Sequence, residues 1–181
     1  LALQYGGYPY VSYEKSLFAV DVEGLNECIT IMCSKVAGCE QRKTGFAETI
    51  LEHMNQRIKK FNHKTGMNCI LAANKKVSVS NRFAALDAEE FPEVFTKIAK
   101  VDEMTQAFSY SQGVSWAGDR HVSPYDKAKN EGLFHQYLQE TAVSCIDLGL
   151  ANASEKQLCD FLTMIMRQTA CDSIYFTPGH K

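Results

Sequence analysis

The sequence predicts an α/β protein in which strands and helices alternate along a single domain covering residues 1–181. Three observations support this prediction. Apolar residues recur every three or four positions in several segments, which is the spacing of one helix face. Short apolar runs lie between these segments, as expected for buried strands of a mostly parallel sheet. No internal repeat or low-complexity linker divides the chain, so one domain is expected.

The first part of the chain predicts a surface loop, a strand and a helix. Residues 1–15 are rich in tyrosine and glycine and are expected to lie on the surface as a loop. An apolar run at 17–22 predicts a strand. Gly24 opens a helix with regularly spaced apolar positions, and Gly38 is expected to end it.

The longest predicted helix begins near Phe46. Its apolar positions lie three or four residues apart, and charged or amide side chains occupy the opposite face. Gly66 stands where a left-handed terminating residue is expected. Residues 68–73 then form a short apolar run typical of a buried strand. The apolar positions of the helix are Phe46, Ile50, Met54, Ile58 and Phe61.

A polar loop is predicted directly after this strand, from Asn74 to Arg82. Loops that leave the ends of buried strands are where α/β proteins tend to bind ligands. A helical turn at 82–87 follows and ends before Pro92. After a strand at 107–111, a second loop is expected over residues 112–123.

The last part of the chain continues the alternation. Residues 125–140 predict a helix and 142–148 a strand. Ser154 and Gln157 have the spacing of a capping box, which predicts that another helix begins there. A final strand is expected at 173–176. Helical crossovers between strands imply a parallel sheet, either open or curved into part of a barrel.

Composition excludes some classes of protein. The net charge is −2 and no basic face stands out, so nothing favours a nucleic-acid partner. No run of about 20 apolar residues occurs, so no membrane span is predicted. The chain begins at Leu1 without a signal pattern, and few residues follow the last strand. We therefore expect an excerpt of a longer polypeptide.

The chain has seven cysteines, and no Cys-x-x-Cys pair occurs. The odd number, together with the apolar surroundings of several of them, favours reduced thiols over a disulfide framework. This pattern indicates a cytoplasmic protein. The spacing of Cys28, Cys33 and Cys39 is not that of a usual zinc site, so no metal ligand is assigned.

Several short segments occur in the order and spacing of one known family. They are Gly24-Leu25-Asn26-Glu27, Thr65-Gly66-Met67-Asn68, Asn81-Arg82-Phe83-Ala84 with Asp87, and His121-Val122 with Pro124. With them, the chain resembles the C-terminal part of the catalytic subunit of anaerobic (class III) ribonucleoside-triphosphate reductase, a glycyl radical enzyme. The resemblance covers about residues 12–178.

The resemblance implies a fold and a chemistry. The family fold is a ten-stranded α/β barrel, of which this chain is expected to form about half. A glycyl radical generates a thiyl radical on a finger-loop cysteine, which abstracts a hydrogen from the ribose of a ribonucleoside triphosphate. A radical-SAM activase with an iron–sulfur cluster installs the glycyl radical. The resemblance further implies a four-cysteine zinc site and a homodimer.

Several of these parts are expected outside this chain. The finger-loop cysteine lies upstream of the matched region in the family, so none of the seven cysteines receives a catalytic role. No glycyl radical segment of the family type occurs, and the zinc cysteines are expected downstream. No catalytic residue is therefore assigned in this chain.

Two loops depart from the family pattern. Where the family commonly reads Thr-Pro-Ala-Glu, this chain reads Asn74 to Val77, and valine cannot transfer a proton. Members with that acid use formate as reductant, so the reductant of this chain is left open. Where the family commonly reads Tyr-Thr-Asn-Ser and holds the substrate phosphates, this chain reads Trp116 to Asp119. Ala117 and Gly118 can still donate backbone N–H groups, whereas the carboxylate of Asp119 would repel a phosphate.

Each substrate-binding candidate also has a structural interpretation. Lys75 can bind a triphosphate or belong to a solvated turn. Arg82 can bind a phosphate, or it can hold the loop by pairing with Asp87 or a backbone carbonyl. Trp116 can stack on a base or fill the core, and His121 can act in the site or be structural. Serine and asparagine suit either a ribose or a turn. The candidates are Asn74, Lys75, Ser78, Ser80, Asn81, Arg82, Trp116, Ala117, Gly118 and His121.

Three functional interpretations remain open at the level of sequence. The first is part of an anaerobic ribonucleoside-triphosphate reductase that acts within a longer chain. The second is a catalytically silent glycyl-radical-like protein that binds nucleotides or a partner. The third is an unrelated α/β domain.

Overall fold

The computed structural model describes residues 4–5, 8–9, 12, 15–35, 42–73, 77–98, 100–101, 108–115, 122–140, 142–147 and 154–177. Within these ranges the chain forms six helices and several small sheets. The helices are α1 (Leu25–Ser34), α2 (Lys43–Thr65), α3 (Val77–Glu90), α4 (Pro92–Ile98), α5 (Pro124–His135) and α6 (Glu155–Gln168). The strands are β1 (Gln4–Tyr5), β2 (Tyr8–Pro9), β3 (Leu17–Asp21), β4 (Asn68–Ala72), β5 (Lys100–Val101), β6 (Phe108–Ser109), β7 (Ser144–Asp147) and β8 (Ile174–Thr177).

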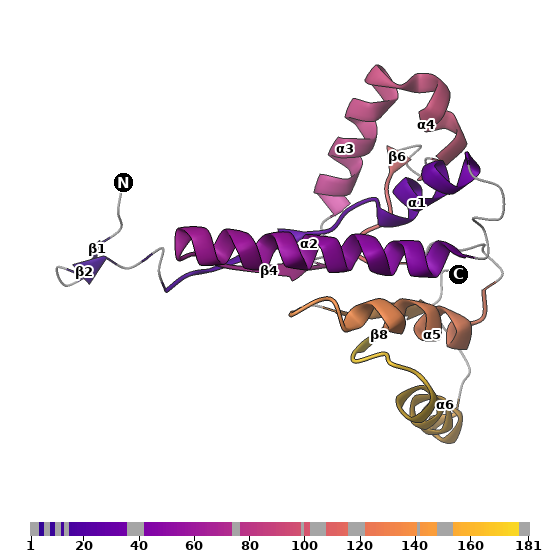
Figure 1. Ribbon diagram of the computed structural model, residues 1–181. Coiled ribbons are helices and arrows are strands. Elements are labelled where there is room, and N and C mark those ends of the chain that lie inside the picture. The colour runs from indigo at the N-terminus through magenta and orange to yellow at the C-terminus, as the bar shows by residue number, and fades with distance from the viewer. Residues whose placement is uncertain are drawn as a thin grey trace.

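Two parallel strand pairs form the α/β framework. β3 pairs with β4 from Leu17↔Asn68 to Asp21↔Ala72, and β7 pairs with β8 from Ser144↔Ile174 to Asp147↔Thr177. Helices α1 and α2 connect the first pair, and α6 connects the second (Figure 1). These pairs confirm the predicted α/β class with helical crossovers. The described strands form two-stranded sheets, and none of these sheets closes into a barrel.

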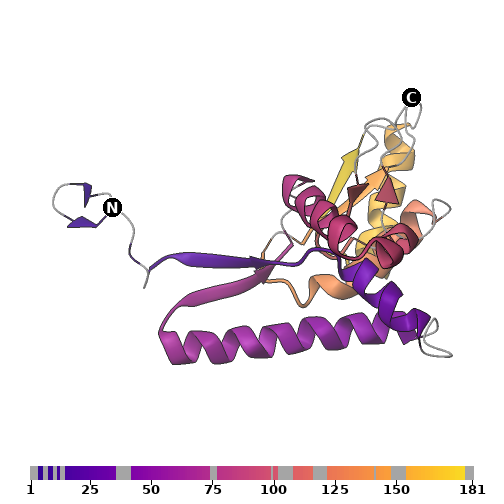
Figure 2. The same cartoon turned by 90° about the horizontal axis from the view of Figure 1, so that it is seen from above.

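Helix α2 confirms the longest helix expected from the sequence and runs alongside the β3–β4 pair (Figure 2). Gly66 ends it in the left-handed conformation, with φ of 72°, and its N–H donates to the carbonyl of Asn62. The side chain of Asn62 also bonds both backbone groups of Cys69, at 2.7 and 2.9 Å. The helix end and the start of β4 are thus fixed to each other.

The buried face of α2 is rotated from the expected one. Ala47 and Leu51 are fully buried, whereas Phe61 is 47% exposed. The other predicted positions pack against the core as partly buried side chains. The small side chain of Ala47 lets α2 approach the core closely. The fully buried positions of α2, Ala47 and Leu51, are therefore each one residue after the predicted positions Phe46 and Ile50.

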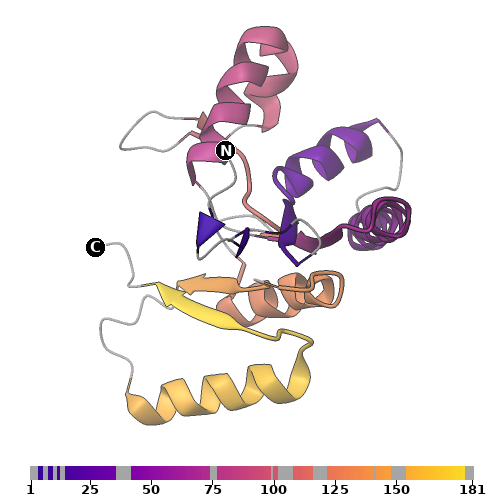
Figure 3. The same cartoon turned by 90° about the vertical axis from the view of Figure 1, so that its left-hand side faces the viewer.

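The described core has two parts on either side of α5. The larger part joins α1, α2 and β4 to Val114, Phe134 and Leu138. The smaller part contains Ala128, Ile146 and Ile165, from α5, β7 and α6. Figure 3 shows α6 beyond the β7–β8 pair, with α3 and α4 on the opposite side of the molecule.

Three element boundaries differ from the sequence prediction. Helix α3 begins at Val77, so residues 77–82 are helical and not part of a loop. Helix α5 ends at His135, because residues 138–140 leave it to run beside β4, where Gln139 N–H donates to the carbonyl of Leu71. Residues 92–98, which had no clear prediction, form α4. The predicted capping box of Ser154 and Gln157 is confirmed at the start of α6.

The described cysteines agree in part with the expectation of reduced thiols. Cys28, Cys69, Cys145, Cys159 and Cys171 are free. Cys33 is disulfide-bonded, so the expectation was wrong at this position. Helix α1 ends at Ser34, with Lys35 as its C-cap, so the expected end at Gly38 was wrong; Gly38 itself lies outside the described residues.

Candidate functional site

The ends of β3 and β4 meet a tight turn formed by residues 111–115. Gly113 N–H donates to the carbonyl of Val22 at 3.0 Å, and Gly24 N–H donates to the carbonyl of Ser111 at 2.8 Å. Gly113 has φ of 61°, a value that favours glycine, and it packs directly against Ala73 at the end of β4. The turn therefore covers the carboxyl ends of both strands.

This turn contacts the described residues that lead into both candidate ligand segments. Residue 74 follows Ala73 directly, and residue 116 follows Ser115 directly. The carboxyl ends of parallel strands are where open α/β sheets place ligands. The structure thus brings Ala73 and Gly113, about 40 residues apart in sequence, into contact at these strand ends.

Most of the predicted site residues lie outside the described part of the chain. Asn74, Lys75, Trp116, Ala117, Gly118 and His121 are not described, and Ser78 is described only as part of the α3 backbone. Their assignment to substrate binding stays a prediction.

Ser80 is fully buried and holds α3 to the segment after β6. Its hydroxyl donates to the carbonyl of Tyr110 at 2.7 Å and accepts the Tyr110 N–H at 3.0 Å. Both functions of the hydroxyl are used in this contact. Of the two interpretations open for Ser80, the geometry favours the structural one.

Asn81 and Arg82 follow Ser80 on α3 but have different surroundings. The side-chain oxygen of Asn81 is buried and accepts no hydrogen bond from a described residue. Arg82 is exposed, with its guanidinium 5.2 Å from the centre of the Phe83 ring. Asp87, the expected ion-pair partner of Arg82, accepts a hydrogen bond from the Tyr110 hydroxyl at 2.7 Å.

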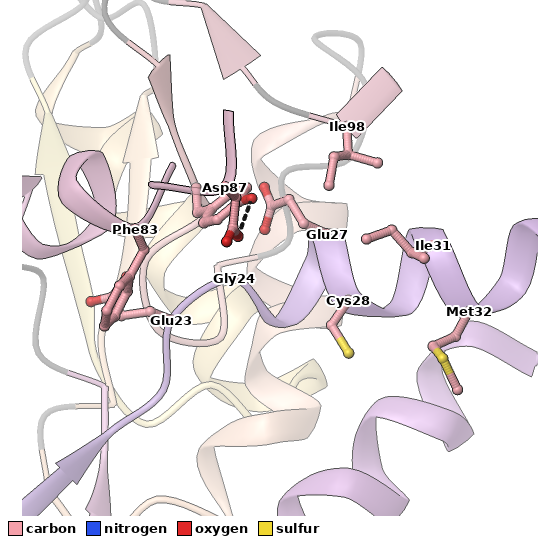
Figure 4. Close-up of a pocket in the computed structure, with 10 residues that line it drawn as sticks. Glu23, Gly24, Glu27, Cys28, Ile31, Met32, Phe83, Asp87 and Ile98 are labelled. Carbon is pink, nitrogen blue, oxygen red and sulfur yellow. Dashed lines mark hydrogen bonds between the residues drawn. The ribbon is translucent and has the colours of Figure 1, made fainter. Parts of the chain in front are cut away.

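A hollow of about 340 Å³ lies between α1, α3 and α4, beside the turn at residues 111–115 (Figure 4). The residues that line it include the acidic Glu23, Glu27 and Asp87 and the apolar Met32 and Phe83. Carboxylates repel phosphate groups. The hollow therefore does not suit a triphosphate.

Glu23 is the most unusual carboxyl group near the site. Both of its side-chain oxygens are buried and have no hydrogen-bond partner among the described residues. Burial, with further contributions from Asp21 and Glu27, raises the pKa of Glu23 to about 7. No local sequence pattern predicts this raised pKa, because it depends on how the β3–α1 junction packs.

The pKa of Glu23 leads to a prediction for stability against pH. Its folded-state pKa lies above the unfolded value of 4.5, so the native state binds the extra proton and is stabilised at low pH. This contribution is complete below about pH 4.5 and is lost as pH rises through about 7. We expect Glu23→Gln, which stays neutral, to become more stable than the wild type at pH 8 by on the order of 1 kcal/mol, allowing for solvent screening.

Urea unfolding at pH 5 and pH 8 measures this effect, with Glu155→Gln as control because Glu155 is exposed on α6. Equal pH dependence in wild type and Glu23→Gln would contradict the prediction.

Comparison with known families decides the identity of the chain. The family model for anaerobic ribonucleoside-triphosphate reductase matches residues 11–181 of this chain. The chain belongs to this family. No curated protein matches the chain at a significant level.

Family membership agrees with the resemblance seen in the sequence. Among the described residues of this family member, no group of three or more His, Cys, Asp or Glu side chains could hold a metal ion. In the same part of the chain, no helix is long and apolar enough to cross a membrane.

Proposed function

We propose that this chain forms a substrate-binding part of an anaerobic ribonucleoside-triphosphate reductase, which converts ribonucleotides to deoxyribonucleotides. The family match over residues 11–181 carries this proposal. The contact between Gly113 and Ala73 supports it, because the described residues that lead toward both candidate loops meet there, at the ends of β3 and β4. In this proposal the chain acts within a longer polypeptide.

The proposed task of these residues is to hold the triphosphate. Lys75 and Lys76 follow β4 and supply positive charge, and Ala117 and Gly118 supply backbone N–H donors. Asn74, Ser78, Asn81, Arg82, Trp116 and His121 are the remaining candidates for the ribose, the base and the phosphates. Asp119 opposes phosphate binding, and the two lysines offset its charge.

The remaining parts of the family machinery are proposed to come from elsewhere in the polypeptide or from partners. The parallel pairs β3–β4 and β7–β8 would belong to one half of a ten-stranded barrel. A glycyl radical and a finger-loop cysteine would supply the radical chemistry, and a radical-SAM activase would install the radical. The family zinc site is likewise expected outside this chain, and a homodimer in the cytoplasm is the proposed assembly.

A charge-removal experiment tests the binding role. We expect Lys75→Ala/Lys76→Ala to weaken cytidine triphosphate binding by on the order of tenfold, because two point charges near the phosphates are lost. Isothermal titration calorimetry on the native polypeptide measures this. Lys59→Ala/Lys60→Ala is the matched control, since it removes the same charge from exposed positions on α2. Equal weakening in both double variants would indicate a general charge effect and contradict the proposed site.

A turnover experiment tests the reductase role. After anaerobic activation, a glycyl radical signal in electron paramagnetic resonance and formation of deoxycytidine triphosphate are expected. Binding of cytidine triphosphate without either result would instead support a catalytically silent member of the family.

A further inference from the structure

Exposed apolar side chains gather along α1, α3 and α4, and α3 and α4 lie on the opposite side of the molecule from α6 (Figure 3). Met32 on α1, Phe83 on α3, and Phe91 and Val94 around the start of α4 are each between 39% and 53% exposed. Single exposed apolar residues are common on protein surfaces, whereas a contiguous set of them marks an interaction site.

Two adjoining hollows connect these side chains into one surface. Met32 and Phe83 line the hollow of about 340 Å³ beside the turn (Figure 4), and Phe91 and Val94 line a second hollow of about 210 Å³. The two linings have four residues in common, so the hollows form one continuous groove, called the α1–α4 groove below. The shared residues are Ile31, Asp87, Ile98 and Tyr110.

The floor of the α1–α4 groove is firmly packed. Phe95 is buried, and its ring meets the rings of Phe108 and Tyr110 edge-on, with centroids 4.7 and 6.2 Å apart. The Tyr110 hydroxyl donates to the carboxylate of Asp87 at 2.7 Å. Aromatic pairs in this arrangement stabilise the packing beyond the area they bury. The groove therefore needs little rearrangement to receive a ligand, which lowers the cost of binding.

Acidic side chains accompany the apolar residues of the groove. The larger hollow is lined by three acidic residues. Glu90, which ends α3, and Glu93, in the first turn of α4, are exposed on either side of Phe91 in the chain. Carboxylates attract lysine and arginine side chains and repel phosphate groups. The α1–α4 groove is therefore complementary to a ligand that combines apolar and basic groups.

A basic amphipathic helix has this combination of groups. Its apolar face can lie in a groove between helices while its lysine and arginine side chains reach the acidic rim. A second copy of this face would bring two acidic rims together, and an anionic membrane surface would meet the same repulsion. We propose that the α1–α4 groove docks a basic amphipathic helix of a partner protein. This inference goes beyond the proposed function, because it involves no nucleotide.

Cysteine footprinting of the native polypeptide tests the location of the site. Cys28 lines the larger hollow, Cys159 lies on α6, and both thiols are free and exposed. The probe is a synthetic amphipathic helix of leucine and lysine. At saturating peptide we expect alkylation of Cys28 by iodoacetamide to slow about tenfold and that of Cys159 to change less than about twofold, because thiol reactivity depends on exposure.

Three outcomes of the footprinting would overturn the proposal. The first is an unprotected Cys28, and the second is equal protection of both thiols. The third is a Cys28 that resists alkylation before peptide is added while Cys159 reacts, because the groove would then already be covered by another part of the polypeptide or by a second copy.

Substitution of the apolar rim tests which side chains hold the peptide. We expect Phe91→Ser/Val94→Ser to weaken binding of the leucine–lysine peptide at least about tenfold in fluorescence anisotropy. Both residues are exposed, so the fold should be retained. Met166→Ser/Tyr175→Ser is the matched control, because it removes exposed apolar side chains from α6 and β8. Equal weakening in the two double variants would contradict docking in the groove.

Charge reversal tests the selection of a basic partner. Glu90→Lys/Glu93→Lys is expected to weaken the leucine–lysine peptide about tenfold and to strengthen a leucine–glutamate peptide of the same pattern by a similar factor. Both effects should shrink at high salt, which screens exposed charges. Glu155→Lys/Asp160→Lys makes the same change in net charge on exposed positions of α6 and is the control. If charge reversal in the groove leaves both affinities unchanged, the groove does not select a basic helix and the proposal fails.

Discussion

Gly132→Ala is expected to destabilise the protein by about 3 kcal/mol. Gly132 lies on α5, where the backbone of Cys171 approaches closely. A Cβ atom at this position would lie 2.6 Å from the nitrogen and 2.8 Å from the Cα of Cys171. Both are backbone atoms, so a side-chain rotation cannot relieve the contact, and α5 has to move away from the segment that precedes β8.

This movement would strain a buried hydrogen-bond chain. His135 accepts the Asp172 N–H at its Nδ1 atom, at 3.0 Å, so the Nε2 atom of the neutral ring carries the proton. Nε2 lies 3.3 Å from the buried hydroxyl of Ser144 on β7 and can donate to it. These hydrogen bonds connect α5 to β7 and to the segment that precedes β8. They depend on the close approach of the two backbones that Gly132 allows.

Thermal unfolding measures the effect, and the expected fall in Tm is roughly 6–12 °C for a domain of this size. Gly45→Ala is the matched control. Gly45 also lies in a helix, but a Cβ atom there meets nothing within 4 Å. Alanine is the better helix former, so Gly45→Ala should stabilise the protein by up to about 1 kcal/mol. A similar Tm change in the two variants would show that helix propensity, and not the close backbone approach, decides the result.

Sequence reasoning predicted the features that depend on local patterns. The helix that Gly66 ends and the capping box of Ser154 and Gln157 were both expected, because each is specified within a few residues. The parallel relation of β3 and β4 followed from the helices between them. These features confirm the α/β class, and the family match confirms the resemblance read from short motifs.

The features that sequence reasoning missed depend on contacts between distant segments. Serine and asparagine at 78–81 favoured a loop, but Ser80 instead holds a helix to Tyr110, 30 residues away. The hydrogen bond between Glu27 and Ser111 joins residues 84 positions apart, so the sequence around Glu27 does not indicate its partner. The same holds for the raised pKa of Glu23, which requires the packed junction. A single sequence gives residue types and spacing, and these three sites depend on tertiary packing.

The second large effect is expected at Gly113, where stability and substrate binding should be lost together. Gly113→Ala combines two costs. A residue with a Cβ is disfavoured at φ of 61° by about 1–2 kcal/mol. The new Cβ would also lie 2.7 Å from the Cβ of Ala73, the residue directly after β4. We expect a destabilisation of about 3–4 kcal/mol in total.

A comparison of three variants separates these costs. Gly66→Ala has nearly the same backbone geometry, with φ of 72°, and no atom within 4 Å of the new Cβ, so it should show the backbone cost alone. Ala73→Gly/Gly113→Ala removes the clash and should recover about half of the loss in urea unfolding, apart from the cost of the new glycine.

Cytidine triphosphate binding then connects stability to the site. Gly113→Ala pushes the turn away from the end of β4, so the two candidate loops start further apart, and we expect binding to weaken at least tenfold under conditions where the variant is still folded. Gly66→Ala should bind like the wild type, because it lies at the far end of β4. Unchanged binding in a folded Gly113→Ala protein would mean that the two loops do not share a ligand, and the site proposed at the strand ends would have to be abandoned.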